Sequence, residues 1–261
     1  MRVSHYRVPV LSLRFITVWR RNFLVWRKLA VPSMLGNLAD PMFYLLALGY
    51  GIGSLVPQVQ GMPYIVFLAS GIICSSTMNS ATFEALWSAF SRMHNQRTWE
   101  SIMNAPISLD DIVLAEALWA ASKSFLSGAA ILLVSWLLGL WHSPLTLWVL
   151  PLTLLIGAAF ASIGLIVTAL APSYDFFMYY FTLVITPMLL ASGVFFPLDQ
   201  LPAALQWIAT ALPLTHAIAL VRPLVHGEVP ADGLLHFAVL LAATAIGYYI
   251  ALVLLRRRLQ S

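Results

Sequence analysis

Six long apolar runs, nearly free of charge, constrain this chain more than any other feature of its sequence. They lie near residues 35–56, 64–86, 112–140, 145–171, 176–196 and 234–255. A helix of about 20 residues crosses the hydrocarbon core of a bilayer. Only 9% of the 261 residues are charged, whereas a soluble domain carries about a quarter. The sequence therefore predicts an all-α integral membrane protein, one membrane domain over 1–261 with six transmembrane helices within 35–255.

The basic residues are distributed unevenly along the chain, and this predicts its orientation. Twelve of the 14 Lys and Arg residues fall in 1–34, 87–111 and the final segment 256–261. Basic residues gather on the cytoplasmic side of membrane proteins. We therefore expect both termini in the cytoplasm, a basic cytoplasmic tail at 256–261, and His142 and Gln200 on the outer side. The net charge of +4 then reflects membrane topology, and no nucleic-acid partner is expected.

Motifs for catalysis and metal binding are missing from the sequence. The single cysteine, Cys74, lies within an apolar run, so neither a disulfide framework nor a thiolate metal site is available. The six histidines are scattered over different segments, and no metal site is expected. The chain has no G-x-x-x-x-G-K-[ST] loop to cradle nucleotide phosphates, no H-E-x-x-H and no G-x-S-x-G. Neither ATP binding nor catalysis is predicted on this chain.

Residues 11–29 have the pattern of an amphipathic helix. At helical spacing one face carries four aromatic residues, Phe15, Trp19, Phe23 and Trp26, while Arg14, Arg21 and Lys28 follow elsewhere at seven-residue intervals. Such a helix lies in the membrane interface, with its aromatics in the headgroup boundary and its cations towards phosphate and water. The alternative is a generic basic anchor that only sets orientation.

The longest polar stretch before the last outer segment is 89–111. Arg97, Trp99 and Glu100 fall within one turn of an expected helix that Pro106 stops. Ser108, followed by two aspartates, then resembles a capped helix start leading into the third span. A plain solvated loop is the alternative.

Residues 197–230 are apolar but too often interrupted by proline to cross the membrane. We expect two short helices, 201–211 and 214–225, joined at Leu212-Pro213. They are predicted to dip back into the outer leaflet or to cap the spans, because irregular backbone at that depth is tolerated only when protein buries it.

The predicted spans contain the ionisable residues Glu84, Glu116 and Lys123. Each costs about 2.5–3.5 kcal/mol at the bilayer centre, so such residues are candidates for function. Glu116 and Lys123 are seven residues apart and share a helix face. Two alternatives use these groups. One is an ion-coupled secondary carrier, and the other is a membrane-embedded lipid- or sugar-modifying enzyme that uses Glu116 with Asp110 and Asp111.

Residues 185–222 resemble the diagnostic stretch of ABC-2 type exporter permeases. Its most specific part is Pro213-Leu214-Thr215-His216 followed, after five residues, by Arg222. Two further segments, 19–53 and 79–112, are similar to the nodulation protein J subfamily of these permeases. The similarity runs in order over nearly the whole chain.

The resemblance implies a homodimer of six-span subunits in the bacterial inner membrane, with two copies of a separate ABC ATPase subunit that binds ATP and Mg²⁺. No cofactor is expected on this chain. The implied substrate is amphipathic: a lipooligosaccharide, a glycolipid or a drug-like molecule, moved out of the cytoplasm or inner leaflet.

The resemblance also implies roles for individual residues. It places the ATPase contact in the loop between spans two and three, at Gln96, Arg97, Trp99, Glu100 and Pro106. The amphipathic helix, with Arg14, Trp19, Arg21, Trp26 and Lys28, would touch the same partner. Outer helices at about 201–225 would form an outer gate at Pro213, His216 and Arg222. Within an apolar segment Arg222 needs outer headgroups or an acid, such as Asp199, Glu228 or Asp232.

Overall fold

Five helices in the described part of the chain are long and apolar enough to cross a membrane. The computed structural model describes residues 6–141 and 143–259, so the prediction for His142 lies outside the described residues. The long helices are α2 (Ala30–Leu55), α3 (Tyr64–Phe83), α5 (Leu109–Leu137), α6 (Val149–Leu170) and α11 (Gly233–Leu259). Helix α3 continues through two π-helical segments, η1 (Glu84–Ser88) and η2 (Ser91–Asn95), and a 3-10 turn, η3 (Pro144–Trp148), precedes α6. The all-helical membrane class is confirmed.

The predicted span at 176–196 is shorter than expected. Helices α7 (Asp175–Tyr180) and α8 (Thr186–Ala191) join through the π-helical segment η4 (Phe181–Ile185) into one apolar helix of 17 residues. At 1.5 Å per residue it covers about 25 Å, less than the hydrocarbon core. It ends early because Gly193 adopts a positive φ of 83°, which a helix cannot accommodate.

The proline-rich segment forms two helices, as predicted, with a sharp bend between them. Helix α9 (Ala203–Ala211), preceded by the 3-10 turn η5 (Leu198–Gln200), and helix α10 (Pro213–His226) meet at an angle of 86°. Pro213 occupies the first turn of α10, where its missing N–H costs no hydrogen bond. The described residues thus hold five candidate spans, or six if this bent pair counts as one. Whether the pair re-enters the outer leaflet remains a prediction.

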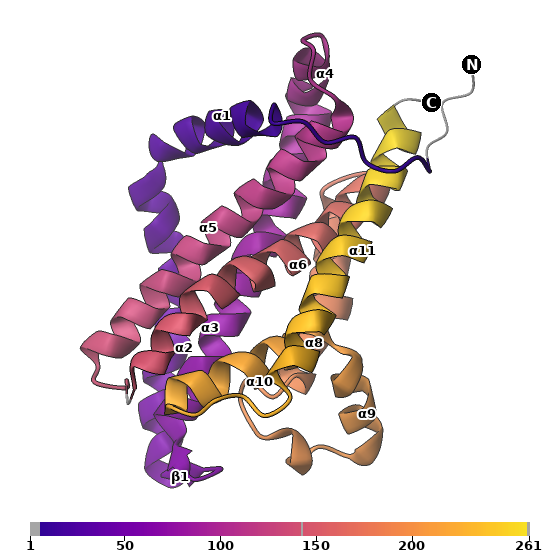
Figure 1. Cartoon of the computed structure of the whole chain (residues 1–261). Coiled ribbons are helices and arrows are strands. Elements are labelled where there is room, and N and C mark those ends of the chain that lie inside the picture. Colours follow the sequence, from indigo (N-terminus) through magenta and orange to yellow (C-terminus); the bar gives the residue numbers. More distant parts are fainter. Residues whose placement is uncertain (1–5, 142, 260–261) are drawn as a thin grey trace.

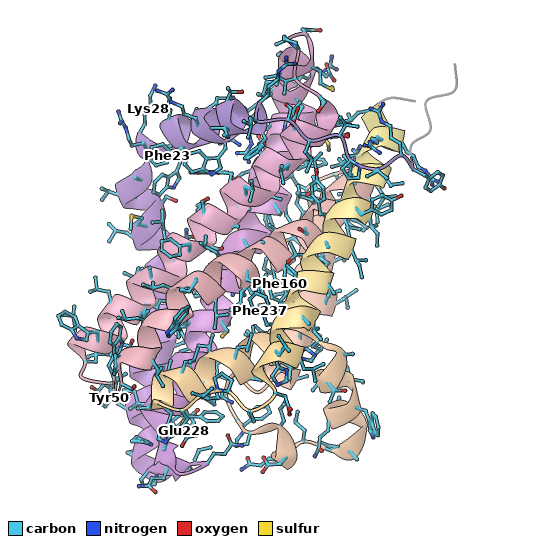
Figure 2. The ribbon with its side chains drawn as sticks, in the orientation of Figure 1. Phe23, Lys28, Tyr50, Phe160, Glu228 and Phe237 are labelled. Carbon is cyan, nitrogen blue, oxygen red and sulfur yellow. The ribbon has the colours of Figure 1, made fainter. Side chains whose placement is uncertain are left out.

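The remaining short elements gather at the two ends of the helix bundle. Helices α1 (Phe15–Arg27) and α4 (Thr98–Met103) lie at one end, together with the end of α11 (Figure 1). The hairpin of β1 (Gln58–Val59) and β2 (Met62–Pro63) lies at the other, near α9 and α10. Lys28 and Glu228 mark these opposite ends in Figure 2. We call them the α1 end and the α10 end.

Helix α3 is the most buried of the five spans and α2 the least. Helices α2, α5, α6 and α10 all pack against α3, and small residues on α3 permit this close approach. At Gly71 an added Cβ would lie 2.6 Å from the carbonyl oxygen of Val194, so only glycine fits there. Helix α2 instead exposes large apolar side chains such as Phe43 and Tyr50.

The described part of the predicted basic tail at 256–261 is helical, and its cytoplasmic position stays a prediction. Helix α11 continues to Leu259, and Arg256 is completely buried. Gln260 and Ser261 lie outside the described residues. The apolar run ends before these arginines, so hydropathy alone placed the helix end too early.

Candidate functional site

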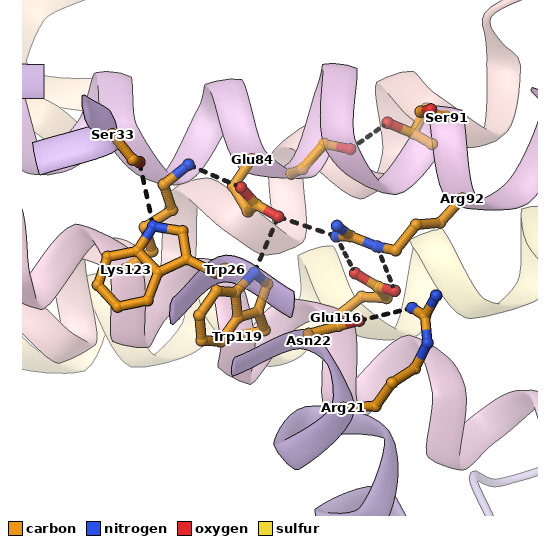
Figure 3. A network of polar contacts seen from close by, with 12 residues as sticks. Arg21, Asn22, Trp26, Ser33, Glu84, Ser91, Arg92, Glu116, Trp119 and Lys123 are labelled. Carbon is orange, nitrogen blue, oxygen red and sulfur yellow. Dashed lines mark hydrogen bonds and ion pairs between the residues drawn. The ribbon is translucent and has the colours of Figure 1, made fainter. Parts of the chain in front are cut away.

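Four charged side chains meet near the α1 end of the bundle in one buried cluster, shown in Figure 3. The guanidinium of Arg92 donates to Glu116 Oε1 and Oε2, at 2.9 and 2.5 Å, and to Glu84 Oε1 at 2.9 Å. The Lys123 ammonium donates to Glu84 Oε2 at 2.9 Å. Two acids and two bases thus compensate one another. We call Glu84, Arg92, Glu116 and Lys123 the charge cluster.

Two tryptophan indoles complete the hydrogen bonding of the cluster carboxylates. Trp119 on α5 donates to Glu84 Oε1 at 2.9 Å, and Trp99 on α4 donates to Glu116 Oε1 at 3.1 Å. Buried carboxylates are stable only when paired and hydrogen-bonded. Both conditions are met here, so neither acid is free to act as a general base.

The sequence analysis identified three members of the cluster but missed Arg92. The apolar run ends near residue 86, so Arg92 was grouped with the polar loop. In the structure the helix continues to Asn95 and carries Arg92 back to the protein interior. The eight-residue spacing between Glu84 and Arg92 was the available signal, because it places two opposite charges about two turns apart on one stripe of a helix.

The aromatic face of α1 packs against protein, which corrects the predicted headgroup position. Trp19, Phe23 and Trp26 surround the ring of Trp119, at centroid distances of 6.3, 6.3 and 5.8 Å. The Trp19 indole donates to Ser122 on α5 at 3.1 Å. Trp119 therefore connects α1 to the charge cluster.

The cations of α1 occupy different environments. Arg21 is half-buried and donates to Asn22 Oδ1 at 3.0 Å, while Lys28 is exposed. Burial, followed by repulsion from Arg92, lowers the pKa of Arg21 against the opposing effect of Glu116. Arg14 donates to the carbonyl oxygen of Pro106. Helix α1 thus contacts the end of the polar loop as well as α5.

The loop between α3 and α5 presents both exposed and buried residues. Gln96, Arg97, Glu100 and Pro106 are exposed, but the side chain of Trp99 is 0% exposed. Trp99 therefore belongs to the interior rather than to the outer face of this loop. The expected single helix is also divided, because Arg97 adopts a positive φ of 49° between η2 and α4.

The two aspartates in the first turn of α5 hold the N-terminal segment in place. Ser108 caps α5 as predicted, since its Oγ accepts from the backbone N–H of Asp111 at 3.1 Å. Asp111 also accepts from the N–H of Ser12 at 2.7 Å. Asp110 accepts from Arg256 at 3.0 and 2.5 Å and from the N–H of Val10 at 2.9 Å. A helix start favours acidic residues in its first turn. That preference does not explain why Asp110 and Asp111 bond to the N-terminal segment and to Arg256.

A cleft of about 740 Å³ lies between α2, α3, α5 and α8. Its lining mixes hydroxyl and amide groups with aromatic rings: Asn37, Ser75, Ser76, Asn79, Ser80, Ser127, Thr186, Tyr44, Phe83, Trp87 and Phe195. Two buried polar atoms in this lining, Asn79 Oδ1 and Ser80 Oγ, have no hydrogen-bond partner among the described residues. Lys123 also lines the cleft, so the cleft and the charge cluster share one side chain. We call this cavity the polar cleft.

At the α10 end, Arg222 has no acidic partner within the described residues, so of the two expected partners, outer headgroups or an acid, the acid is not found there. Its Nε donates to Ser70 Oγ at 3.0 Å and its Nη2 to the carbonyl oxygen of Gly193 at 2.7 Å. The guanidinium lies over the ring of Phe67, 3.6 Å from its centroid. The predicted acids Asp199, Glu228 and Asp232 form no ion pair with it.

His216 contacts a histidine on another helix, a pairing that the sequence analysis did not consider. Its Nδ1 lies 2.8 Å from Nδ1 of His236 on α11, and its Nε2 lies 2.9 Å from the carbonyl oxygen of Thr210. A carbonyl only accepts, so Nε2 of His216 carries a proton and, in the neutral ring, Nδ1 accepts from His236. The pair joins α10 to α11.

Within the described residues, no three His, Cys, Asp or Glu side chains are grouped as a metal site. The carboxylates that an enzyme would use are held by Arg92, Arg256, Ser12 and Ser108. The polar cleft offers hydrogen bonding and ring stacking, together with two charged side chains in its lining, Asp40 and Lys123.

Comparison with known proteins identifies relatives along the chain. Residues 14–225 match the family model described as ABC-2 type transporter. Nodulation protein J of Rhizobium leguminosarum bv. viciae is 49% identical over 252 residues, which cover 97% of each chain. Nodulation protein J of Rhizobium meliloti (strain 1021) is 46% identical, over 97% of this chain and 96% of that protein. The inner membrane transport permease YadH of Escherichia coli (strain K12) is 24% identical over 207 residues.

Proposed function

This chain belongs to the ABC-2 type transporter family, and on that premise we propose that it is the permease subunit of an ATP-driven exporter of an amphipathic molecule. The proposed substrate is a lipooligosaccharide or related glycolipid. ATP and Mg²⁺ would bind to a separate ABC ATPase subunit, present in two copies. The permease itself would act as a homodimer in the bacterial inner membrane.

The polar cleft is the observation that carries the substrate proposal. Its hydroxyl and amide groups suit a polyhydroxylated headgroup, and its rings offer flat faces for sugars. The surrounding spans are apolar and suit an acyl chain. Asn79 Oδ1 and Ser80 Oγ lack partners among the described residues, so a ligand that bonds to them recovers a desolvation cost already present in the fold.

Contact with the ATPase is assigned to the exposed residues Gln96, Arg97, Glu100 and Pro106, together with α1. The charge cluster supports a physical route from this surface to the cleft. Lys123 lines the cleft and bonds to Glu84, Arg92 joins Glu84 to Glu116, and Trp99 joins Glu116 to α4. A shift of α4 on ATPase binding would change the hydrogen bonds of a group that lines the cleft.

The orientation that we propose places the α1 end in the cytoplasm. The basic residues of α1, of the loop before α4 and of the end of α11 gather there, as expected for a cytoplasmic surface. Helix α1 would then lie along the inner interface with its aromatic face on the protein and its exposed cations towards headgroups. The bent pair α9 and α10 would cap the outer side, and the exposed apolar face of α2 suits a second copy of the chain.

The bonds of the buried carboxylates argue against both alternative functions, the membrane-embedded enzyme and the ion-coupled carrier. An enzyme would need an accessible carboxylate, but Asp110, Asp111 and Glu116 are buried and bonded. An ion-coupled carrier would need acids that gain and lose protons during transport. Glu84 and Glu116 are instead paired with Arg92, and Glu84 with Lys123 as well.

The test is substrate-stimulated ATP hydrolysis by the complex of this chain with its co-purified ATPase in liposomes, using an acylated chito-oligosaccharide as the probe. Ser80→Ala removes an unpaired hydroxyl from the cleft, so it should leave folding unchanged and raise the KM for stimulation about threefold or more. Ser162→Ala removes an equally buried unpaired hydroxyl that does not line the cleft, and should change nothing.

Failure of an ATPase to co-purify with the chain would contradict the exporter assignment. Identical KM values for Ser80→Ala and Ser162→Ala would contradict the cleft as the substrate site.

A further inference from the structure

The guanidinium of Arg222 presents an unusual electrostatic situation for a membrane protein. It is largely shielded from solvent, yet its partners are a hydroxyl, a carbonyl and an aromatic face, all of them neutral. Its third nitrogen, Nη1, forms no hydrogen bond with any described residue. A buried charge that lacks a counter-charge is costly. The fold therefore keeps a positive charge at Arg222 that no acid among the described residues neutralises.

A cavity of about 540 Å³ opens beside this guanidinium at the α10 end. The turn after α8 contributes Ser192, and α10 contributes Thr215, Arg222 and His226. Thr215 precedes Arg222 by seven residues and His226 follows it by four, spacings that place all three on one face of the helix. The cavity is distinct from the polar cleft, since the two share no lining residue.

Two hydroxyl groups in the lining are buried and unpaired. Ser192 is 1% exposed and Thr215 is 8% exposed, and neither Ser192 Oγ nor Thr215 Oγ1 has a hydrogen-bond partner among the described residues. A hydroxyl can donate to a ligand oxygen without rearranging the backbone. Two such donors beside a guanidinium form a set of groups suited to an oxyanion.

We propose that this cavity binds the anionic oxygens of a phosphate, sulfate or carboxylate group, with Arg222 as the charged ligand and Ser192 and Thr215 as neutral donors. The site lies at the opposite end of the bundle from the α1 end, so it goes beyond the proposed ATPase contact and the polar cleft. An anion there supplies the counter-charge that Arg222 lacks.

The acids near the cavity do not reverse this preference. Asp199 and Glu228 also line it, but both are exposed, and Glu228 lies 3.9 Å from His226. Water and salt screen exposed charges, whereas the partly buried guanidinium keeps most of its field. Removing one acid should therefore strengthen anion binding, and Glu228→Gln provides that test.

The experiment uses the full chain purified in a neutral, phosphate-free maltoside detergent. Inorganic phosphate or sulfate replaces chloride at constant ionic strength, and binding is measured by calorimetry and by the rise in Tm. We expect Arg222→Lys to weaken binding about tenfold, because a point charge cannot donate from a fork. Glu228→Gln should strengthen binding a few-fold.

A double variant keeps the proposal testable if changes at Arg222 reduce folded yield. Ser192→Ala with Thr215→Val removes the two unpaired donors and leaves every bond of Arg222 in place, so the protein should fold and bind about fivefold or more weakly. Thr82→Val is the matched control, because Thr82 Oγ1 is also buried and unpaired but does not line the cavity. It should bind as the wild type does.

The source of the anion is separated by a second arm with phosphatidylglycerol added to the detergent and lipid retention followed by native mass spectrometry. Retention that depends on Arg222, without binding of free phosphate or sulfate, identifies a lipid headgroup. Binding of the free ions identifies a small anion or an anionic group on a substrate. Equal binding by the wild type and the double variant, or no binding of any probe to the wild type, overturns the proposal.

Discussion

The two ends of the molecule treat buried charge in opposite ways. Near the α1 end, Arg92 and Lys123 face Glu84 and Glu116, and both of these carboxylates are bonded. Near the α10 end, Arg222 faces only neutral groups. A compensated cluster can join helices rigidly and transmit movement, whereas an uncompensated charge is available to a ligand. This difference is the basis on which we propose coupling for the first region and anion binding for the second.

Loss of Arg92 should have the largest effect, because one guanidinium serves both acids. Arg92→Met leaves Glu116 without a positive partner among its bonded groups, and breaking such a buried pair costs about 3–5 kcal/mol. Folded yield and the midpoint of thermal unfolding in detergent measure this loss. A variant as stable as the wild type would show that the cluster does not hold the helices together.

Substitution of Lys123 tests whether the stability of the fold depends on the charge balance of the charge cluster or on the Lys123 ammonium itself. Lys123→Met should destabilise the fold by about 2 kcal/mol or more, since Glu84 loses one of its two cations. Adding Glu84→Gln should recover part of that loss, because the remaining pair of Arg92 and Glu116 is neutral overall. A double variant less stable than the sum of the two single changes would contradict the charge-balance account.

Arg222→Leu should cost less than Arg92→Met, and this ordering is the direct test of the comparison. It removes two hydrogen bonds and one ring contact, together about 1–3 kcal/mol, but leaves no acid unpaired. We also expect increased leak of a small dye from liposomes, since Arg222 ties α10 to α3 and to the turn after α8. If Arg222→Leu were the more damaging change, the charge of Arg222 would be structural.

Charge reversal in the exposed loop should have the smallest effect on stability. Arg97→Glu and Glu100→Arg change surface residues that form no ion pair in the described structure, so the free energy of unfolding should move by about 0.5 kcal/mol or less. In the complex these variants should uncouple ATP hydrolysis from export. Normal assembly, hydrolysis and export would contradict the placement of the ATPase contact.

The buried Trp99 of the same loop tests coupling through the charge cluster separately from contact at the exposed surface. Trp99→Phe keeps the ring packing and removes one hydrogen bond to Glu116, a change of about 1–2 kcal/mol. It should reduce coupling without touching the exposed surface. Equal coupling in this variant and the wild type would exclude the route through Glu116.

Features that depend on neighbouring residues were predictable from the sequence. Hydropathy located four of the five long helices to within a few residues and the membrane class as a whole. The capping of α5 by Ser108 and the break before Pro213 follow from local backbone chemistry. The start of α2 was placed five residues late and the span at 176–196 was overestimated, because apolar composition does not reveal where a helix begins or ends.

The partners of the charged and aromatic side chains were decided only by the tertiary structure. The amphipathic pattern of α1 identified an apolar face but could not tell whether lipid or Trp119 covers it. Arg92 meets Glu116 across 24 residues, and Arg256 meets Asp110 across 146. Such pairs depend on which helices pack together and at what rotation, whereas hydropathy, caps and proline breaks act within a single segment. The neutral surroundings of Arg222 follow from the same packing. Helix α3 and the turn after α8 supply the groups that its guanidinium contacts, and none of these groups is an acid.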